Sequence, residues 1–239
     1  MADEQPIPSA WTRPRRKKEQ ALSQEQIVAE AVRLLDAEGV EALTMRRLGT
    51  QMGTAATSLY RHVTNRDELI ELVVDEVYGE IEVPAPASAQ DWRAGVTACA
   101  HSVRSMILRH PWIASVLGQV GLSYLGPNVM RLNDRMLGLF ASGGFGMVEA
   151  DQAISAVMAY VIGIGISEAA LLTVIARSGQ DEQDWEKRLR PTVEQATRPY
   201  PHLREHFTAH GDKDLRQVRE DHFAYGLGLF LDGLETRRS

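Results

Sequence analysis

Apolar residues recur every three or four positions along most of this chain, a spacing that predicts helices throughout. The alternating pattern of strands is nearly absent, so we expect an all-α fold. In the first helix, Ser23 and Gln26 form a capping box and Gly39 marks the end. The inward-facing positions of this helix are Ile27, Ala31, Leu34 and Leu35.

Three short helical segments follow and complete a small N-terminal domain. Thr44 is placed to cap the second helix, which ends at Gly53 in a turn that tolerates a left-handed residue. A third segment covers residues 55–63, and Asn65 opens a fourth helix. Two short helices joined by a tight turn are typical of a helix-turn-helix, so residues 23–83 are predicted to bind DNA.

A Pro/Ala/Ser-rich stretch at residues 83–90 separates this domain from a larger helical domain, residues 91–239. Within the larger domain, residues 153–176 are almost wholly apolar and have the length of a membrane span. Glu168 lies inside that stretch, Gly163 interrupts it, and no basic cluster flanks its start. We therefore expect a helix buried in the core or in a contact between subunits, and no membrane association.

Charge is distributed unevenly, and this changes the expected partners. The net charge of −6 excludes a protein that coats nucleic acid through overall charge. Residues 1–66 nevertheless carry 10 basic and 8 acidic side chains, whereas residues 67–239 carry 16 and 24. Residues 1–22 are predicted to form a flexible basic arm, with five cations between Arg13 and Lys18. An ordinary solvated tail is the alternative.

The single cysteine, Cys99, limits redox chemistry and metal binding. With one thiol, neither a disulfide within the chain nor a thiolate zinc cage can form, which favours a reducing compartment. Cys99 lies on an apolar helical stripe, which indicates a packed thiol and not a nucleophile. The N-terminus lacks the apolar core of a signal peptide, so we expect a cytoplasmic protein.

The second helix of the predicted helix-turn-helix carries side chains suited to DNA. The small residues Ala56 and Thr57 can approach thymine methyl groups, and Arg46 of the preceding helix is long enough to reach guanine. Nearby hydroxyl, imidazole and guanidinium groups can donate to phosphate oxygens. The predicted DNA-binding residues are Thr44, Arg46, Thr54, Ala56, Thr57, Ser58, Tyr60, Arg61, His62 and Arg66.

The segment from Leu43 to Val73, LTMRRLGTQMGTAATSLYRHVTNRDELIELV, resembles the DNA-binding domain of the tetracycline-repressor (TetR) family. The matching features are Leu43-Thr44, Arg46 with Leu48, Gly53, Leu59-Tyr60, His62-Val63, and Asn65-Arg66 followed by Leu69. Four later segments resemble the C-terminal domain of the tetracycline-repressor branch: LRHPW at 108–112, AISAV at 153–157, YPHL at 200–203 and FAYGLGLFLDGLE at 223–235.

This resemblance implies a homodimeric transcriptional regulator that responds to a small-molecule inducer, with repression as the family's usual mode. The helices at 151–176 and 215–236 would pair with those of a second copy in a four-helix interface. Two recognition helices would then lie about one DNA turn apart, roughly 34 Å, and read a palindromic double-stranded operator. Ligand in the second domain would move the helix at 66–82 and change that spacing.

Two departures from the tetracycline-repressor pattern change the expected ligand and operator. In the prototype tetracycline repressor, a histidine and a glutamate hold metal-bound tetracycline. Their positions correspond to the neighbourhood of Val116 and Ser167 in this chain, although Glu168 is adjacent to the second position. We therefore expect an inducer other than magnesium-tetracycline. The prototype's recognition helix carries a glutamine that reads bases, and this chain has Ala56 at that position. The operator should therefore differ too.

Methionine and aromatic side chains of the second domain suit a hydrophobic organic ligand. Most side chains at such positions belong to the hydrophobic core, and only the family resemblance indicates that some of them contact a ligand. The candidate pocket residues are Trp112, Tyr124, Met130, Met136, Phe140, Met158 and Tyr160.

His202, Glu205 and His206 match the H-x-x-E-H signature of inverted zinc proteases, with His210 one turn further on. Such residues on a helix could share a zinc ion, so a zinc-binding protein or hydrolase is the alternative function. Pro199 makes the local helix uncertain, and a chance match on a solvated loop is favoured. With no other catalytic motif, we expect no enzyme activity, metal or cofactor.

Overall fold

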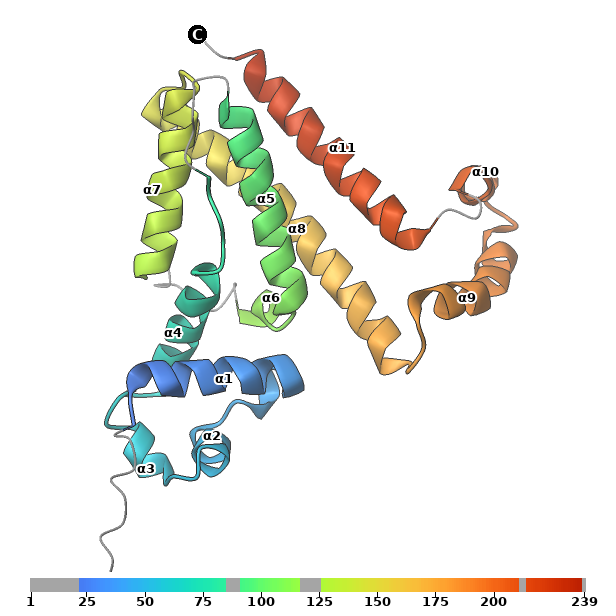
Figure 1. Cartoon of the computed structure of the whole chain (residues 1–239). Helices are drawn as coiled ribbons and strands as arrows, with labels where there is room; N and C mark the ends of the chain where they lie inside the picture. The colour runs from blue at the N-terminus through green and yellow to red at the C-terminus, as the bar shows by residue number, and fades with distance from the viewer. Residues whose placement is uncertain (1–21, 85–90, 117–125, 211–213, 238–239) are drawn as a thin grey trace, which may run out of the picture.

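The computed structural model describes residues 22–84, 91–116, 126–210 and 214–237, and within these ranges the chain is helical without strands (Figure 1). The predicted all-α class is confirmed. The predicted arm, residues 1–22, lies outside the described residues except for Leu22. The elements are α1 (Gln24–Glu38), the 3-10 helix η1 (Val40–Ala42), α2 (Met45–Gln51), α3 (Ala56–Leu59), α4 (Arg66–Tyr78), α5 (Trp92–Arg109), α6 (Ile113–Val116), α7 (Pro127–Ser142), α8 (Met147–Arg177), α9 (Glu182–Thr197), α10 (Pro201–His210) and α11 (Leu215–Glu235).

Local capping chemistry sets the helix starts in the N-terminal domain. The Ser23 hydroxyl accepts the Gln26 N–H at 3.3 Å, and the Gln26 side chain accepts the Ser23 N–H at 3.1 Å. The Thr44 hydroxyl accepts the Arg47 N–H at 3.1 Å, and the Asn65 side chain starts α4 in the same way. The third segment is shorter than predicted, because α3 ends at Leu59 and continues as turns.

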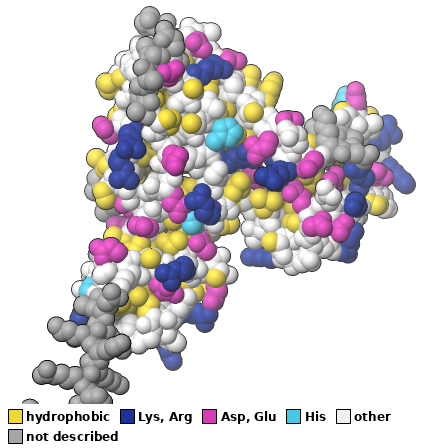
Figure 2. All heavy atoms as spheres, viewed as in Figure 1, with side chains coloured by type: hydrophobic (Ala, Val, Ile, Leu, Met, Phe, Trp, Pro, Cys, Tyr) yellow, Lys and Arg dark blue, Asp and Glu magenta, His cyan; other side chains and the backbone are white. Residues whose placement is uncertain are grey.

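The larger domain is built on α5, α7 and α8, with α11 packed along α8 (Figure 1). An aromatic cluster of Trp92, Phe140 and Phe145 joins α5 to the end of α7, with ring centroids 5.0–5.7 Å apart. Helices α9 and α10 project from this body as a separate lobe, which the space-filling view shows at the right (Figure 2). We call these two helices the arm lobe.

Helix α8 is 31 residues long, and by length and composition alone it is apolar enough to cross a membrane. Only 28% of its most apolar 18-residue window is buried within this chain, so the helix is not enclosed by its own core, and burial in a contact between subunits stays a prediction. The outer face consists mainly of small side chains, and every one of them is exposed: Ser155, Ala156, Ala159, Gly163, Ser167, Ala170 and Val174.

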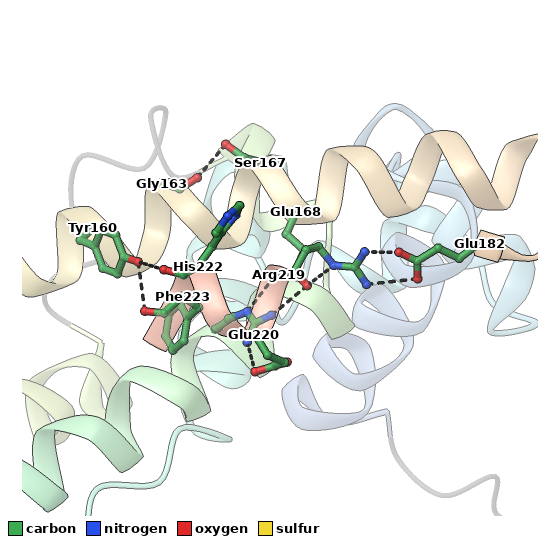
Figure 3. A network of polar contacts seen from close by, with 10 residues as sticks. Tyr160, Gly163, Ser167, Glu168, Glu182, Arg219, Glu220, His222 and Phe223 are labelled. Carbon is green, nitrogen blue, oxygen red and sulfur yellow. Dashed lines mark hydrogen bonds and ion pairs between the residues drawn. The ribbon is translucent and has the colours of Figure 1, made fainter. Parts of the chain in front are cut away.

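Helices α8 and α11 approach closely at Gly226. The Tyr160 hydroxyl donates to the carbonyls of His222 and Phe223, both at 3.1 Å (Figure 3). A Cβ added at Gly226 would lie 2.1 Å from the Tyr160 hydroxyl oxygen, so no side chain fits there without displacing the tyrosine. The glycine is therefore required by the contact between the two helices.

Gly226→Ala is expected to lower the free energy of unfolding by about 1–3 kcal/mol, because overpacking would force Tyr160 off both carbonyls. Urea denaturation measures the effect. Gly138→Ala on α7 is the matched control, since a Cβ there meets nothing within 4 Å. The control should stabilise the protein by roughly 0.5–1 kcal/mol, as alanine is the better helix former. Equal effects of both substitutions would contradict the tight contact.

Candidate nucleic-acid interface and ligand domain

The turn between α2 and α3 depends on two glycines. Gly53 has φ +66°, the left-handed conformation that the sequence predicted for this position. A Cβ at Gly49 would lie 2.9 Å from the Thr54 carbonyl oxygen, so α2 can meet the start of α3 only because residue 49 has no side chain. Sequence reasoning missed Gly49, although a glycine inside a short helix was a signal for close approach.

The α2–α3 pair lies at the tip of the N-terminal domain, away from the rest of the chain (Figure 1). Of the ten predicted DNA-binding residues, five are exposed: Thr44, Arg46, Thr57, Tyr60 and Arg61. Five are half-buried: Thr54, Ala56, Ser58, His62 and Arg66. Tyr60 is 51% exposed, so about half of this large aromatic side chain is accessible to a partner. Leu59 beside it is fully buried and anchors α3.

Arg66, a predicted phosphate contact, makes two hydrogen bonds within its own domain. Its Nε donates to the Leu43 carbonyl at 3.0 Å, and one terminal nitrogen donates to the Val40 carbonyl at 3.2 Å. The guanidinium thus braces α4 against the segment that leads into α2. A second brace, Gln24 to the His62 carbonyl at 3.1 Å, was also missed. Neither contact has a sequence signal, because each joins residues at least 23 positions apart.

The predicted pocket residues lie in different surroundings. Met136 and Phe140 are fully buried in the core, Met130 is 52% exposed, and Met158 is half-buried. The Trp112 indole N–H donates to Asp36 of α1 at 2.7 Å, which places it at the junction of the two domains. Tyr160 is bonded to α11 as described, and Tyr124 lies outside the described residues. None of the six described candidates lines the groove that lies beside the end of α4.

A groove of about 500 Å³ lies instead beside the end of α4, and sequence reasoning missed it. Arg131 and Arg135, one turn apart on α7, give one wall a positive charge. Ser102 of α5 accepts the Glu82 N–H at 2.9 Å and closes the opposite side. The complete lining is Gly79, Ile81, Glu82, Val83, Pro84, Ala98, Ser102, Arg131 and Arg135.

Helix α4 is anchored to α7 by Asp75. Its carboxylate accepts the N–H groups of Asn128 and Val129 at 3.0 and 3.1 Å, and the Asn128 amide donates back to Asp75. Gly126, the residue at the N-cap of α7, has no side chain to do this. A helix of the N-terminal domain therefore caps a helix of the C-terminal domain.

Glu168, the one carboxylate in the apolar stretch of α8, is the centre of a buried ionic network (Figure 3). Arg104 of α5 donates to both of its oxygens at 2.7 and 2.9 Å, and Arg219 of α11 donates at 2.9 Å. Arg104 also binds Glu220 at 2.8 Å, while Arg219 binds Glu182 at the start of α9. This network explains how a charged side chain is accommodated in an apolar helix, because both partners of Glu168 carry the opposite charge.

Burial and pairing act in opposite directions on these charges. Burial lowers the pKa of Arg104, but hydrogen bonds to Glu168 and Glu220 outweigh burial and raise the pKa overall. The hydrogen bond from Arg104 lowers the pKa of Glu220. Ser167, where the resemblance expected a glutamate to be replaced, faces outwards, and its hydroxyl donates to the Gly163 carbonyl at 2.9 Å.

The proposed zinc motif lies on a regular helix, so the expectation of a loop is wrong. Pro201 occupies the first position of α10, where its missing N–H costs no helical hydrogen bond. His202, Glu205 and His206 are all exposed, and the His210 side chain is outside the described residues. Among the described residues, no group of three or more His, Cys, Asp or Glu side chains could hold a metal ion. The geometry therefore gives the zinc alternative no support.

Both domains match known families. Residues 27–73 match the model for bacterial regulatory proteins of the tetR family, and residues 85–238 match the tetracyclin repressor-like C-terminal domain. An exposed helix-turn-helix joined to a large helical domain defines a DNA-binding transcriptional regulator, the class that the sequence predicted. The chain belongs to the TetR family of such regulators.

Similar proteins come from actinomycetes and from Escherichia coli. The HTH-type transcriptional repressor DrrR1 of Streptomyces coeruleorubidus is 33% identical over 226 residues, which span 94% of this chain and 81% of DrrR1. The class A tetracycline repressor from transposon 1721 of Escherichia coli is 26% identical over 213 residues, 89% of this chain and 90% of that protein. The crystal structure of ActR from Streptomyces coelicolor in complex with actinorhodin has a TM-score of 0.73 at 30% identity, covering 91% and 97% of the two chains.

Proposed function

We propose that this protein is a cytoplasmic, homodimeric repressor that binds a palindromic operator and leaves it when a hydrophobic small molecule binds the C-terminal domain. The observation that carries the proposal is the presence of two exposed surfaces on one chain. One is the α2–α3 tip, and the other is the apolar outer face of α8 and α11.

The α2–α3 tip supplies the DNA contacts. Thr57 and Ala56 stand at the start of α3 and have little bulk, so the backbone there can approach base edges. Arg46 projects from α2 beside them and reads guanine, while Tyr60 and Arg61 bind phosphates. Arg66 is left out of the contact set, because its guanidinium is used as a brace.

A second copy of the chain covers the outer face of α8 and α11. Tyr225 is 72% exposed and Leu229 is 56% exposed, one turn apart on α11. The small residues on the outer face of α8 would let another helix approach closely. A continuous apolar surface of this kind is typical of an interface in a permanent dimer.

The inducer acts where the C-terminal domain meets α4. ActR, a similar protein, binds actinorhodin and (S)-DNPA, which supports a ligand site in a domain of this fold. The groove beside Glu82 is the candidate site, since its lining begins at Gly79, directly after α4. Its apolar residues Ile81, Val83, Pro84 and Ala98 suit the hydrophobic part of a ligand. A ligand there releases DNA only by its preference for the non-binding state. Mass spectrometry of co-purified ligand tests this, and a small, highly charged metabolite would contradict it.

Tyr60→Ala is expected to weaken binding to all duplexes, because it removes a contact to phosphate. Arg46→Ala should instead relax the preference at one base pair in each half-site, at a cost of about 1–3 kcal/mol for the preferred base. Gel shifts on a set of single-base variants of the bound duplex distinguish the two. Tyr60→Ala without effect on any duplex would show that the backbone contacts are wrongly placed.

Selection from a random pool of duplexes supplies the operator and tests the proposed function as a whole. We expect enrichment of one palindrome whose binding weakens steeply with salt, because each neutralised phosphate releases counterions. Glu71→Gln, an exchange on α4 away from the α2–α3 tip, is the control for general loss of fold. Recovery of no enriched sequence would contradict DNA recognition by this chain.

A further inference from the structure

Four polar side chains from distant parts of the sequence meet where the two domains join. His110, in the turn between α5 and α6, is only 3% exposed. Its Nδ1 lies 2.7 Å from the Asp36 carboxylate on α1, and its Nε2 lies 3.1 Å from the Glu80 carboxylate just after α4. Arg109 pairs with the other oxygen of Glu80. We call these four residues the junction cluster.

Both nitrogens of the His110 ring face a carboxylate oxygen, and this determines which form of the ring fits. A neutral imidazole has one N–H and one lone pair, so one of its nitrogens would oppose the lone pairs of a carboxylate. The imidazolium form donates at both positions. With His110 cationic, two cations balance the two carboxylates of the junction cluster.

Trp112 supports the contact between His110 and Asp36 from a second direction. Its indole N–H donates to the Asp36 oxygen that faces His110, at 2.7 Å, and its ring lies edge-on to the imidazole at 6.0 Å between centroids. Trp112 is itself buried at 5% exposure. The last turn of α1 is therefore held by two donors that both belong to the C-terminal domain.

We propose that His110, as a cation bonded to Asp36 and Glu80 together, is the positioning residue that holds the helix-turn-helix domain in fixed orientation on the C-terminal domain. Asp36 lies on α1, which packs against α2 and α4, so the position of α1 sets the direction of the recognition helix. Loss of the imidazolium would free α1 from the α5–α6 turn. The consequence for operator affinity rests on the proposed function, whereas the orientation itself does not.

Pulsed electron–electron resonance measures that orientation without DNA. Spin labels at Glu41→Cys on η1 and Asp134→Cys on α7 report the distance between the domains, and excess unlabelled chain ensures that one chain per assembly is labelled. Cys99 is buried, and burial raises the pKa of its thiol to about 12, so it escapes labelling. We expect a narrow distance distribution for the wild-type chain.

His110→Gln should broaden the distance distribution, and Asp36→Asn should do the same. The control is His202→Gln, an exposed histidine of the arm lobe, which should behave as wild type. A wild-type distribution that is already broad, or a His110→Gln distribution as narrow as that of wild type, would overturn the proposal. If His110→Gln does not fold, Asp36→Asn decides, because its side chain is already one-third exposed (34%).

Operator affinity gives the second readout and separates this proposal from the proposed function. On the selected duplex, His110→Gln should weaken binding about tenfold, the scale of one charge-assisted hydrogen bond. The double variant with Asp36→Asn should lose less affinity than the sum of the two single losses, because both substitutions remove the contact between His110 and Asp36. Additive losses of operator affinity would contradict a direct contact between His110 and Asp36. Absence of DNA binding by wild type would instead contradict the proposed function and leave the resonance result valid.

Discussion

Tyr225→Glu combined with Leu229→Glu is expected to convert the protein to a monomer and to weaken operator binding by at least about 100-fold. Both side chains are largely exposed on α11, Tyr225 at 72% and Leu229 at 56%, so the substitutions should leave the core of the chain intact. Two carboxylates from each copy would meet like charges across the symmetric contact, where the same patch faces itself.

Sedimentation equilibrium measures the assembly state, and anisotropy on the selected duplex measures affinity. Met130→Glu is the matched control, because Met130 is an exposed apolar residue on α7 outside this face. The control should remain dimeric and bind as wild type. A double variant that stays dimeric would mean that α8 and α11 are covered by something other than a second copy.

Arg104→Ala is expected to lower the free energy of unfolding by about 3–5 kcal/mol. The substitution leaves Glu168 buried in α8 with one cationic partner in place of two, and it removes the guanidinium that lies 4.7 Å from the centre of the Phe223 ring. The network joins α5, α8, α9 and α11, so its loss affects the whole C-terminal domain.

Arg93→Ala provides the comparison, since Arg93 lies on the same helix and also pairs with carboxylates of α11. That pair is on the surface, so its loss should cost less than about 1 kcal/mol. Urea denaturation of both variants measures the difference. Equal losses would show that the burial of the Glu168 network has no special effect on stability.

The sequence predicted the parts of this molecule that depend on neighbours in the chain. The capping box at Ser23, the N-caps at Thr44 and Asn65, and the helical character of nearly every segment follow from residues three or four positions apart. Prolines 199 and 201 led to one error, because the same residue that breaks a helix interior is well suited to the first turn of α10.

Contacts between distant residues could not be predicted in the same way. Arg66 looked like a phosphate ligand by composition, and only the folded chain shows that the Leu43 and Val40 carbonyls occupy its guanidinium. Glu168 drew attention as a charge in an apolar stretch, but its partners are 64 and 51 positions away. Of the residues chosen for a pocket, Met136 and Phe140 lie in the core whereas Met130 is exposed, because periodicity indicates buried positions without distinguishing core from cavity.

Hydroxyl-radical footprinting on the selected duplex tests the central claim most directly. Two exposed helix-turn-helix tips in one symmetric dimer predict two protected regions related by a dyad, with centres about 10 base pairs apart. A single protected region, or two regions without dyad symmetry, would contradict a dimer that reads a palindrome through α3.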